Sequence, residues 1–400
     1  MKKRIFSLAL ALVMIMSVCF SVSAFAADDV NPAPLKFNIG EFKVMHLCDC
    51  QDGYPAIDTM LKFIDAALKE YKPDIVVLGG DNTVGKKETK ALAIEELCNV
   101  FVENKTYFTL VFGNHDREQG FENDELLPMY QIYGKGYCLA YDEVPSLHGT
   151  ATHNLPVMSS DGKKIKFNLW MFDSGSKYID ENGNNLGIYD CVREDQIEWY
   201  QAKSKALETL AGGKVPSLAF QHIVVGEVYE ALFHESLVDL DVVTPKANGK
   251  IYSFFPKTEN IQDGFLFEFP CPSEKNHGQF DAMVKGGDVL AVFSGHDHIN
   301  SYTTELDGVK IINTPGATFD SYGNDIVRGV RMITVKEDNT WDFETEVVTI
   351  SQFALDNKDF AEDAGIDTFT ASLMLTLGDI LLALNNLTKG FSSIISLIFA

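Results

Sequence analysis

Side chains that commonly bind metal ions follow several apolar segments of this 400-residue sequence. In residues 109–116, TLVFGNHD, an apolar run ends at a glycine, and Asn114, His115 and Asp116 follow at once. Similar segments are Val44–Asp49, Asp74–Asn82, Ser217–His222 and Val289–His298. Because ligands of open α/β sheets bind at the carboxyl ends of strands, the pattern predicts a metal site built from strand ends.

Six oxygen or nitrogen donors lie at or beside these predicted strand ends. They are Asp49, Asp81, Asn114, His222, His296 and His298. A single histidine in this position is usually only a hydrogen-bonded loop residue, but six donors in one layer are hard to explain as structure alone. An extended backbone would direct His296 and His298 to the same side. The set suits two neighbouring cations better than one structural zinc, which would prefer cysteine.

The elements that position these donors begin with a β-α-β-α-β pattern. The predicted strands are Phe42–Cys48, Ile75–Leu78 and Phe108–Phe112, with helical apolar spacing in 57–68 and 91–101 between them. Right-handed crossovers imply a parallel sheet whose loops gather at one edge. We therefore expect Asp49, Asp81 and Asn114 to converge.

The remaining segments predict a second sheet. Strands are expected at Lys166–Phe172, Pro216–Phe220, Val289–Phe293, Ser301–Glu305, Val309–Asn313, Val327–Val335 and Trp341–Thr349, and a helix at Arg193–Leu207. We expect the strands after residue 289 to form a meander in a sheet packed against the first. Segment 117–166 predicts loops over the site, and 233–287 predicts an insertion on the substrate side.

The N-terminal residues 1–26 have the pattern of a secretory signal peptide. A basic start, an apolar stretch over 5–20 and the small-x-small sequence Ala24-Phe25-Ala26 predict cleavage and export, with an uncleaved anchor as the alternative. Six cysteines follow this segment and form no CxxC pair. They indicate neither a zinc ribbon nor a dense disulfide scaffold.

The C-terminal segment 366–400 has an apolar helical face. Polar or charged residues interrupt it at Asp379, Asn385, Asn386 and Lys389, so we expect it to fall short of a membrane-spanning helix. Attachment to a membrane interface through 370–400, self-association, and docking on the chain's own surface remain alternatives.

The formal charge of -24 and the pI near 4.7 exclude nucleic acid and anionic lipid as favoured partners, because both require a positive field. The same charge would repel a phosphate-bearing substrate. Such a substrate would therefore need bound cations near it.

These motifs together resemble the calcineurin-like metallophosphoesterases, whose pattern is D-x-H, G-D, G-N-H-[DE], a separate His and G-H-x-H. The later motifs stand here as residues 80–81, 113–116 and 295–298, with His222 as the separate histidine. The resemblance covers about residues 40–335 and implies a domain over 40–350. It implies a four-layer α/β/β/α sandwich of two packed mixed sheets around two divalent metal ions, such as Mn, Fe or Zn.

The resemblance assigns a role to each donor. Asp81 would bridge the two metals. Asp49 and His298 would complete one metal's shell, and Asn114, His222 and His296 the other's. Two such metals polarise the phosphoryl oxygens and lower the pKa of a bound water that attacks phosphorus. His115 would stabilise or protonate the leaving oxygen, and Asp116 would hold its orientation.

The chain departs from the family pattern at two positions. Gln51 stands where the D-x-H motif has a histidine ligand, and an amide oxygen binds transition metals more weakly than imidazole. The metal near Asp49 would bind loosely, prefer a harder cation, or recruit Asp52 or water. Val84 replaces the tyrosine of the purple acid phosphatase branch, so no tyrosinate–iron(III) chromophore is expected.

The sequence thus predicts an exported, metal-dependent phosphoesterase acting on phosphomonoesters or phosphodiesters. The assignment of His222 depends on its strand-end position alone, and His153 and His234 are rival candidates. A degenerate, non-catalytic surface binding protein on the same fold is the alternative, and Gln51 favours it. Cyclic nucleotides or phospholipid headgroups are further substrate candidates.

Overall fold

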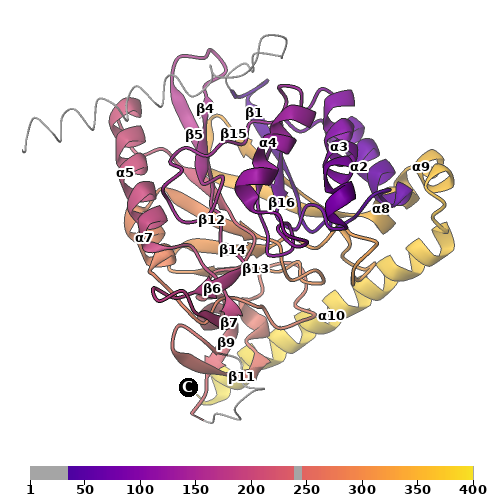
Figure 1. Cartoon of the computed structure of the whole chain (residues 1–400). Coiled ribbons are helices and arrows are strands. Elements are labelled where there is room, and N and C mark those ends of the chain that lie inside the picture. Colours follow the sequence, from indigo (N-terminus) through magenta and orange to yellow (C-terminus); the bar gives the residue numbers. More distant parts are fainter. Residues whose placement is uncertain (1–34, 238–245, 400) are drawn as a thin grey trace, which may run out of the picture.

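Two large β-sheets pack face to face in the computed structural model, which describes residues 35–237 and 246–399 (Figure 1). The five-stranded sheet has the order β16-β15-β1-β2-β3, and the six-stranded sheet has the order β13-β14-β12-β8-β5-β4. The predicted signal segment 1–26 lies outside the described residues.

The first sheet contains the expected β-α-β-α-β unit. Its strands are β1 (Glu41–Leu47), β2 (Ile75–Gly79) and β3 (Phe108–Val111), connected by α2 (Asp58–Tyr71) and α3 (Lys90–Glu103). All three strands are parallel, so their carboxyl ends lie at one edge. In the second sheet, β5 (Ile165–Met171), β8 (Ser217–Phe220), β12 (Val289–Ser294) and β14 (Val309–Asn313) are also parallel, whereas β4 (His153–Met158) and β13 (Thr303–Leu306) are antiparallel edge strands.

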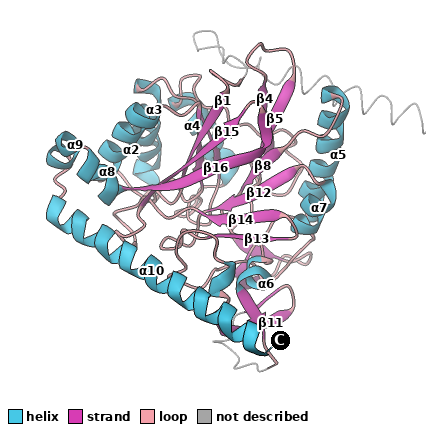
Figure 2. Ribbon diagram, turned by 180° about the vertical axis from the view of Figure 1, so that it is seen from behind, coloured by secondary structure: helices cyan, strands magenta, loops and turns pink. Residues whose placement is uncertain are grey.

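Alternation along the strands divides the interior into three apolar cores. On β2, Ile75 and Val77 face the core between the sheets, whereas Val76 and Leu78 face the helices. The helices over the first sheet are α2, α3, α4 (Asn123–Tyr133), α8 (Ile350–Asp356) and α9 (Lys358–Asp363). Those over the second are α5 (Glu194–Ala211), α6 (Val228–Leu232) and α7 (Gln279–Gly286). Figure 2 shows helices on both outer faces, which confirms the four-layer sandwich.

The expected meander of late strands in the second sheet is wrong. Strands β15 (Gly329–Lys336) and β16 (Asn339–Thr349) return to the first sheet, where β15 pairs antiparallel with β1. Ile333 and Val335 then fill the core between the sheets, and Met332 faces the helices. The free edge of β1 thereby gains a partner that local sequence alone does not specify.

Two segments expected to be irregular contain regular structure. Segment 117–166 includes α4, which begins with a capping box formed by Glu122 and Glu125, and β4. Segment 233–287 includes α7 and a small sheet of β9 (Phe233–Glu235), β10 (Lys246–Ala247) and β11 (Lys250–Pro256). A separate hairpin is formed by β6 (Lys177–Ile179) and β7 (Asn185–Tyr189).

The C-terminal segment is a single long helix, α10 (Thr368–Phe399), which runs along one side of the molecule (Figures 1 and 2). Its window 368–386 is long and apolar enough to cross a membrane by length and composition alone, contrary to our expectation. Ala371 and Gly378 are buried, and a Cβ on Gly378 would lie 3.2 Å from Ile326 Cγ2. The exposed side chains include Phe369, Leu373, Leu377, Ile380, Leu381 and Leu384.

Candidate metal centre

Five strand ends bring the predicted metal ligands together. Asp49 follows β1, Asp81 follows β2, Asn114 follows β3, His222 follows β8, and His296 and His298 follow β12. All six are buried. The ligand atoms of Asp81, His222 and His296 lie within 4.8 Å of one another, as do those of Asp49, Asp81 and His298. Asp81 is the residue that the two groups share.

Backbone carbonyls orient two of the histidines toward the carboxylates. His222 Nδ1 is 2.9 Å from Gly79 O, and its Nε2 is 3.1 Å from Asp81 Oδ2 and 4.0 Å from Asp49 Oδ1. His298 Nδ1 is 2.9 Å from Tyr322 O, and its Nε2 is 3.4 Å from Asp49 Oδ1. Metal-binding histidines are commonly oriented in this way through their second ring nitrogen.

Several buried polar atoms of this cluster have no hydrogen-bond partner. They are Gln51 Oε1, Asn114 Oδ1 and His296 Nε2, whereas His222 Nε2 and Asp49 Oδ1 have only their ion-pair contacts within the cluster. Buried polar atoms are nearly always satisfied in native proteins, so a group of unsatisfied donors and acceptors in one place requires an explanation. Carboxylate, amide and imidazole atoms are suitable ligands for divalent transition metals. The residues therefore fit two divalent cations that share Asp81.

The electrostatics of the cluster also favour cations. Burial opposes ionisation, yet the charge of His222 holds the pKa of Asp81 well below its usual range. Burial likewise opposes protonation of His222, but Asp81 and then Asp49 raise its pKa to about 10. By contrast, burial and the nearby charge of His222 lower the pKa of His296 to about 3. The carboxylates thus attract positive charge into the site.

Glycines allow the strand ends to approach one another. A Cβ on Gly113 would lie 2.2 Å from Asp81 Oδ1, and a Cβ on Gly295 would lie 2.7 Å from Asp49 Oδ2. Each of these glycines precedes a candidate ligand in the chain. The glycines in the motifs are therefore needed because each ligand loop touches a carboxylate of a neighbouring loop.

His115 lies at the mouth of the centre, with its side chain 40 % exposed. Its backbone nitrogen donates a 2.7 Å hydrogen bond to Asp81 Oδ1, which ties the residue to the shared carboxylate. Its Nδ1 is 2.7 Å from Glu118 Oε1. Sequence reasoning missed Glu118, which holds the imidazole in place of the expected Asp116.

Asp116 does not orient His115, and that prediction is wrong. Its buried carboxylate accepts backbone hydrogen bonds from Gly113 at 2.8 Å, Asn82 at 2.9 Å and Thr83 at 3.2 Å. Burial, partly offset by the charge of Lys90, raises its pKa to about 6. Asp116 therefore braces the loops after β2 and β3, because three backbone amides converge on its two oxygens.

Gln51 enters the centre, but Asp52 does not. Gln51 Nε2 is 3.5 Å from Asp81 Oδ2, and its Oε1 is among the unsatisfied atoms. The carboxylate of Asp52 instead accepts backbone hydrogen bonds from Gly53 at 2.8 Å and Ile57 at 2.6 Å. Recruitment of Asp52 as a replacement ligand is therefore contradicted.

The two rival histidines lie elsewhere. His153 is buried in β4, where its ring nitrogens are 2.8 Å from Thr109 Oγ1 and 2.7 Å from Ala151 O. His234 is exposed on β9. Of the three candidates for the separate histidine, the structure places only His222 beside the carboxylates.

Two tyrosines pack on the candidate ligand histidines. The ring of Tyr189 meets His296 edge-on, with 4.5 Å between centroids, and Tyr322 stacks on His298 at 4.2 Å. The Tyr322 hydroxyl donates to both carboxylate oxygens of Glu268 at 3.3 Å. Tyr189 lies in no motif, so the sequence offered no signal for it, whereas Tyr322 lies in a polar loop that made it a possible phosphate-side residue.

Comparison with known proteins agrees with this geometry. The family model described as calcineurin-like phosphoesterase matches residues 42–300, which is more than half of the chain. The chain belongs to this family. It is 27 % identical over 365 residues to "Probable inactive purple acid phosphatase 14" of Arabidopsis thaliana, covering 82 % of this chain and 84 % of that protein. It is 25 % identical over 356 residues to "Probable inactive purple acid phosphatase 29" of the same plant, covering 80 % and 83 %.

A solved structure with a similar fold is a dimetal phosphatase from Danio rerio, at 14 % identity and a TM-score of 0.47 over 76 % of this chain and 98 % of that one. The family-model match over residues 42–300 confirms, at the level of the calcineurin-like family, the resemblance seen in the sequence motifs. Both Arabidopsis relatives are named as purple acid phosphatases, the branch whose tyrosine is replaced by Val84 in this chain.

Proposed function

We propose that this calcineurin-like protein is a metal-dependent phosphoesterase that hydrolyses phosphate monoesters or diesters outside the cytoplasm. The observation that carries the proposal is the pair of ligand groups sharing Asp81, whose buried donor atoms include several without partners. A binding surface elsewhere on the fold would have no use for such atoms, because each unsatisfied buried group is destabilising.

The chain's own residues would divide the work as follows. Asp81 would hold both cations, with Asp49 and His298 as further ligands of one and Asn114, His222 and His296 as further ligands of the other. When bound, two divalent cations polarise phosphoryl oxygens and acidify water. His115 donates a proton to the leaving oxygen, while Glu118 fixes its Nδ1 and so leaves Nε2 for that transfer.

A non-catalytic binding protein is the second candidate, and two observations favour it. Gln51 replaces a histidine of the family pattern, and the two Arabidopsis relatives are named probable inactive. In that case the centre would still bind metal, but the protein would catalyse no hydrolysis and His115 would have no catalytic role. Metal content and turnover must therefore be measured together.

The experiment uses the mature chain and its Asp81→Asn variant. We expect two equivalents of metal by elemental analysis and hydrolysis of 4-nitrophenyl phosphate after loading with Mn²⁺, Fe²⁺ or Zn²⁺. Asp81→Asn should lose both. Bound metal without turnover under any of the three cations would favour the binding protein, and absence of bound metal would contradict both candidates.

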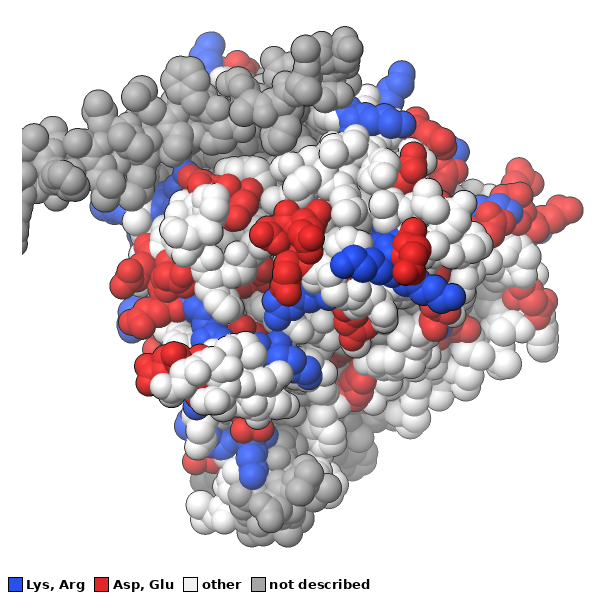
Figure 3. Space-filling view, in the orientation of Figure 1, with Lys and Arg blue, Asp and Glu red and all other residues white. Residues whose placement is uncertain are grey.

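We also propose that the protein is exported and rests on a neutral lipid surface through α10. The pattern in residues 1–26 supports export. Between Thr368 and Asn386, α10 exposes large apolar side chains and contains no lysine or arginine, which suits uncharged lipid better than anionic lipid. Figure 3 shows Lys and Arg interspersed with Asp and Glu on the face it displays.

Flotation with phosphatidylcholine vesicles tests the lipid proposal. Leu377→Glu and Ile380→Glu change exposed positions and should abolish flotation without loss of the folded state. A chain that stays in the soluble fraction and instead forms dimers sensitive to these substitutions would show self-association in place of lipid binding.

A further inference from the structure

The β6–β7 hairpin places a lysine close to the candidate metal centre. Lys177 in β6 pairs with Tyr189 in β7. The Tyr189 ring packs edge-on against His296, and the Lys177 ammonium nitrogen lies 4.1 Å from the centroid of the Tyr189 ring. A candidate metal ligand, an aromatic ring and a cation are therefore in contact one after another.

The opposite side of the hairpin is held by Tyr178. The guanidinium carbon of Arg193 lies 3.7 Å from the centroid of this ring, and Arg193 Nη2 donates to Ile179 O at 3.2 Å. His277 is parallel to the ring, and its Nε2 is 3.2 Å from the Tyr178 hydroxyl. At the start of the hairpin, the Ser176 hydroxyl donates to Asn114 O at 3.2 Å.

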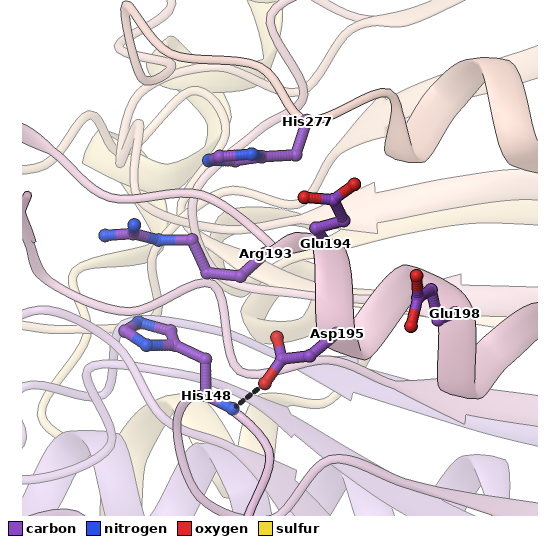
Figure 4. Close-up of a pocket in the computed structure, with 6 residues that line it drawn as sticks. All are labelled: His148, Arg193, Glu194, Asp195, Glu198 and His277. Atoms are coloured by element: carbon purple, nitrogen blue, oxygen red, sulfur yellow. Dashed lines mark hydrogen bonds between the residues drawn. The ribbon is translucent and has the colours of Figure 1, made fainter. Parts of the chain in front are cut away.

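A pocket of about 450 Å³ lies beside the hairpin, and its lining includes the basic residues Arg193, His148 and His277 (Figure 4). Arg193 lies between His277 and His148 in this view. Arg193 Nε donates to buried Asp190 at 2.7 Å, and His148 Nε2 is 2.9 Å from the same carboxylate. These groups are paired with each other, so they anchor the hairpin and are not free to bind an anion.

Lys177 differs from these groups. It is exposed, and none of the ion pairs within residues 35–237 and 246–399 involves it. The chain carries a formal charge of -24, so most of its surface repels anions. The Lys177 ammonium has no acidic partner and lies close to the candidate metal centre, so it can attract an anion where most of the surface repels anions.

We propose that Lys177 binds a second anionic group of the substrate and so selects phosphate esters whose alcohol portion carries a carboxylate or another phosphate. This inference rests on the proposed phosphoesterase function. The centroid of the Tyr189 ring lies 4.1 Å from Lys177 Nζ and 4.5 Å from the His296 ring centroid. A single aromatic ring therefore separates Lys177 from His296, so the substrate feature that Lys177 would contact is a second anion joined to the phosphate by a short spacer.

Two non-hydrolysable probes test this selection on the full metal-loaded chain. 3-Phosphonopropionate carries the extra carboxylate, and propylphosphonate has a similar length without it. We expect calorimetric titration to show about five-fold tighter binding of 3-phosphonopropionate, the upper range for an exposed ion pair. Lys177→Gln should remove this preference, whereas Lys177→Arg should keep it.

Lys310→Gln is the matched control, because Lys310 Nζ also lies over an aromatic ring, 4.7 Å from the Phe343 centroid, but on β14. It should leave the preference unchanged. Raising the ionic strength tenfold should weaken the wild-type preference, as screening of an exposed pair requires. An equal preference in wild type and Lys177→Gln, or no binding of either probe, would overturn the inference.

The result also separates this inference from the proposed function. If no cation supports hydrolysis of 4-nitrophenyl phosphate but Lys177→Gln still abolishes the carboxylate preference, the enzyme proposal fails and the anion site stands. If hydrolysis occurs and the preference does not depend on Lys177, the enzyme proposal stands and the anion site is refuted.

Discussion

Replacing Asp81 by asparagine is the most direct perturbation of the candidate centre. The substitution keeps the shape of the side chain but removes the charge of the carboxylate that both ligand groups share. Divalent cations that bind only the folded chain raise its stability by mass action. The wild-type chain should therefore melt at a higher temperature in Mn²⁺, whereas Asp81→Asn should not.

The expected shift in melting temperature can be worked out from the stabilisation by bound cations and from the chain length. A cation present at one hundred times its Kd adds about 2.7 kcal/mol to the free energy of unfolding. The unfolding entropy is about 2 cal/mol/K per residue, so a 400-residue chain gains roughly 1 °C for each kcal/mol. Each tightly bound cation should raise the wild-type melting temperature by about 3 °C, and Asp81→Asn should show a shift below about 1 °C.

Asp116→Asn is the control, because Asp116 is a buried carboxylate of a neighbouring loop that faces backbone amides. An amide cannot accept all of these hydrogen bonds, so the metal-free variant should lose about 1–3 kcal/mol of stability. Its Mn²⁺-dependent shift should remain. The assay is differential scanning calorimetry after chelation, with and without added Mn²⁺. A full shift in Asp81→Asn, or its loss in Asp116→Asn alone, would refute the assignment of the shared ligand.

Three further predictions concern individual side chains. Gln51→His should bind one metal about ten-fold more tightly in a competition titration, since imidazole is the better ligand; unchanged affinity would exclude Gln51 from that shell. His115→Ala should keep its metal content but lower turnover about 10²- to 10⁴-fold, with a smaller loss in Glu118→Gln; full turnover would exclude the acid role. Burial lowers the pKa of His153 to about 4, below the usual 6.5, so protonation of the unfolded chain should remove about 2 kcal/mol of stability at pH 5 relative to pH 7.5, and His153→Gln should melt with less acid sensitivity than wild type.

The sequence was sufficient to predict the parallel unit and the residues at its strand ends. Short apolar runs indicate β1, β2 and β3, and the handedness of the crossovers places their loops at one edge. His222 could be proposed because β8 ends at the same layer, and the structure brings it within 3.1 Å of Asp81. These predictions depend on local periodicity and topology, which a sequence displays directly.

Other features depended on contacts between distant segments. The return of β15 to β1 joins residues almost three hundred positions apart, for example Phe42 and Val335, and an alternating strand pattern does not name its partner. The direction of Asp116 is decided by three backbone amides of folded loops. Asp116 is next to His115 in the chain, and this adjacency led to the wrong prediction that Asp116 orients the imidazole.

The backbone conformation of the centre adds an argument about Gln51. Four buried non-glycine residues there have left-handed φ values: Asp49 at 50°, Gln51 at 42°, Asp81 at 49° and His296 at 73°. Such a conformation costs an ordinary residue about 1–2 kcal/mol, and strain of this kind concentrates at functional sites. A protein that used only its outer surface would gain nothing from this strain. Since Gln51 shares it and directs its amide toward Asp81, we expect the replacement of the family histidine to change the composition of the candidate metal site without removing that site.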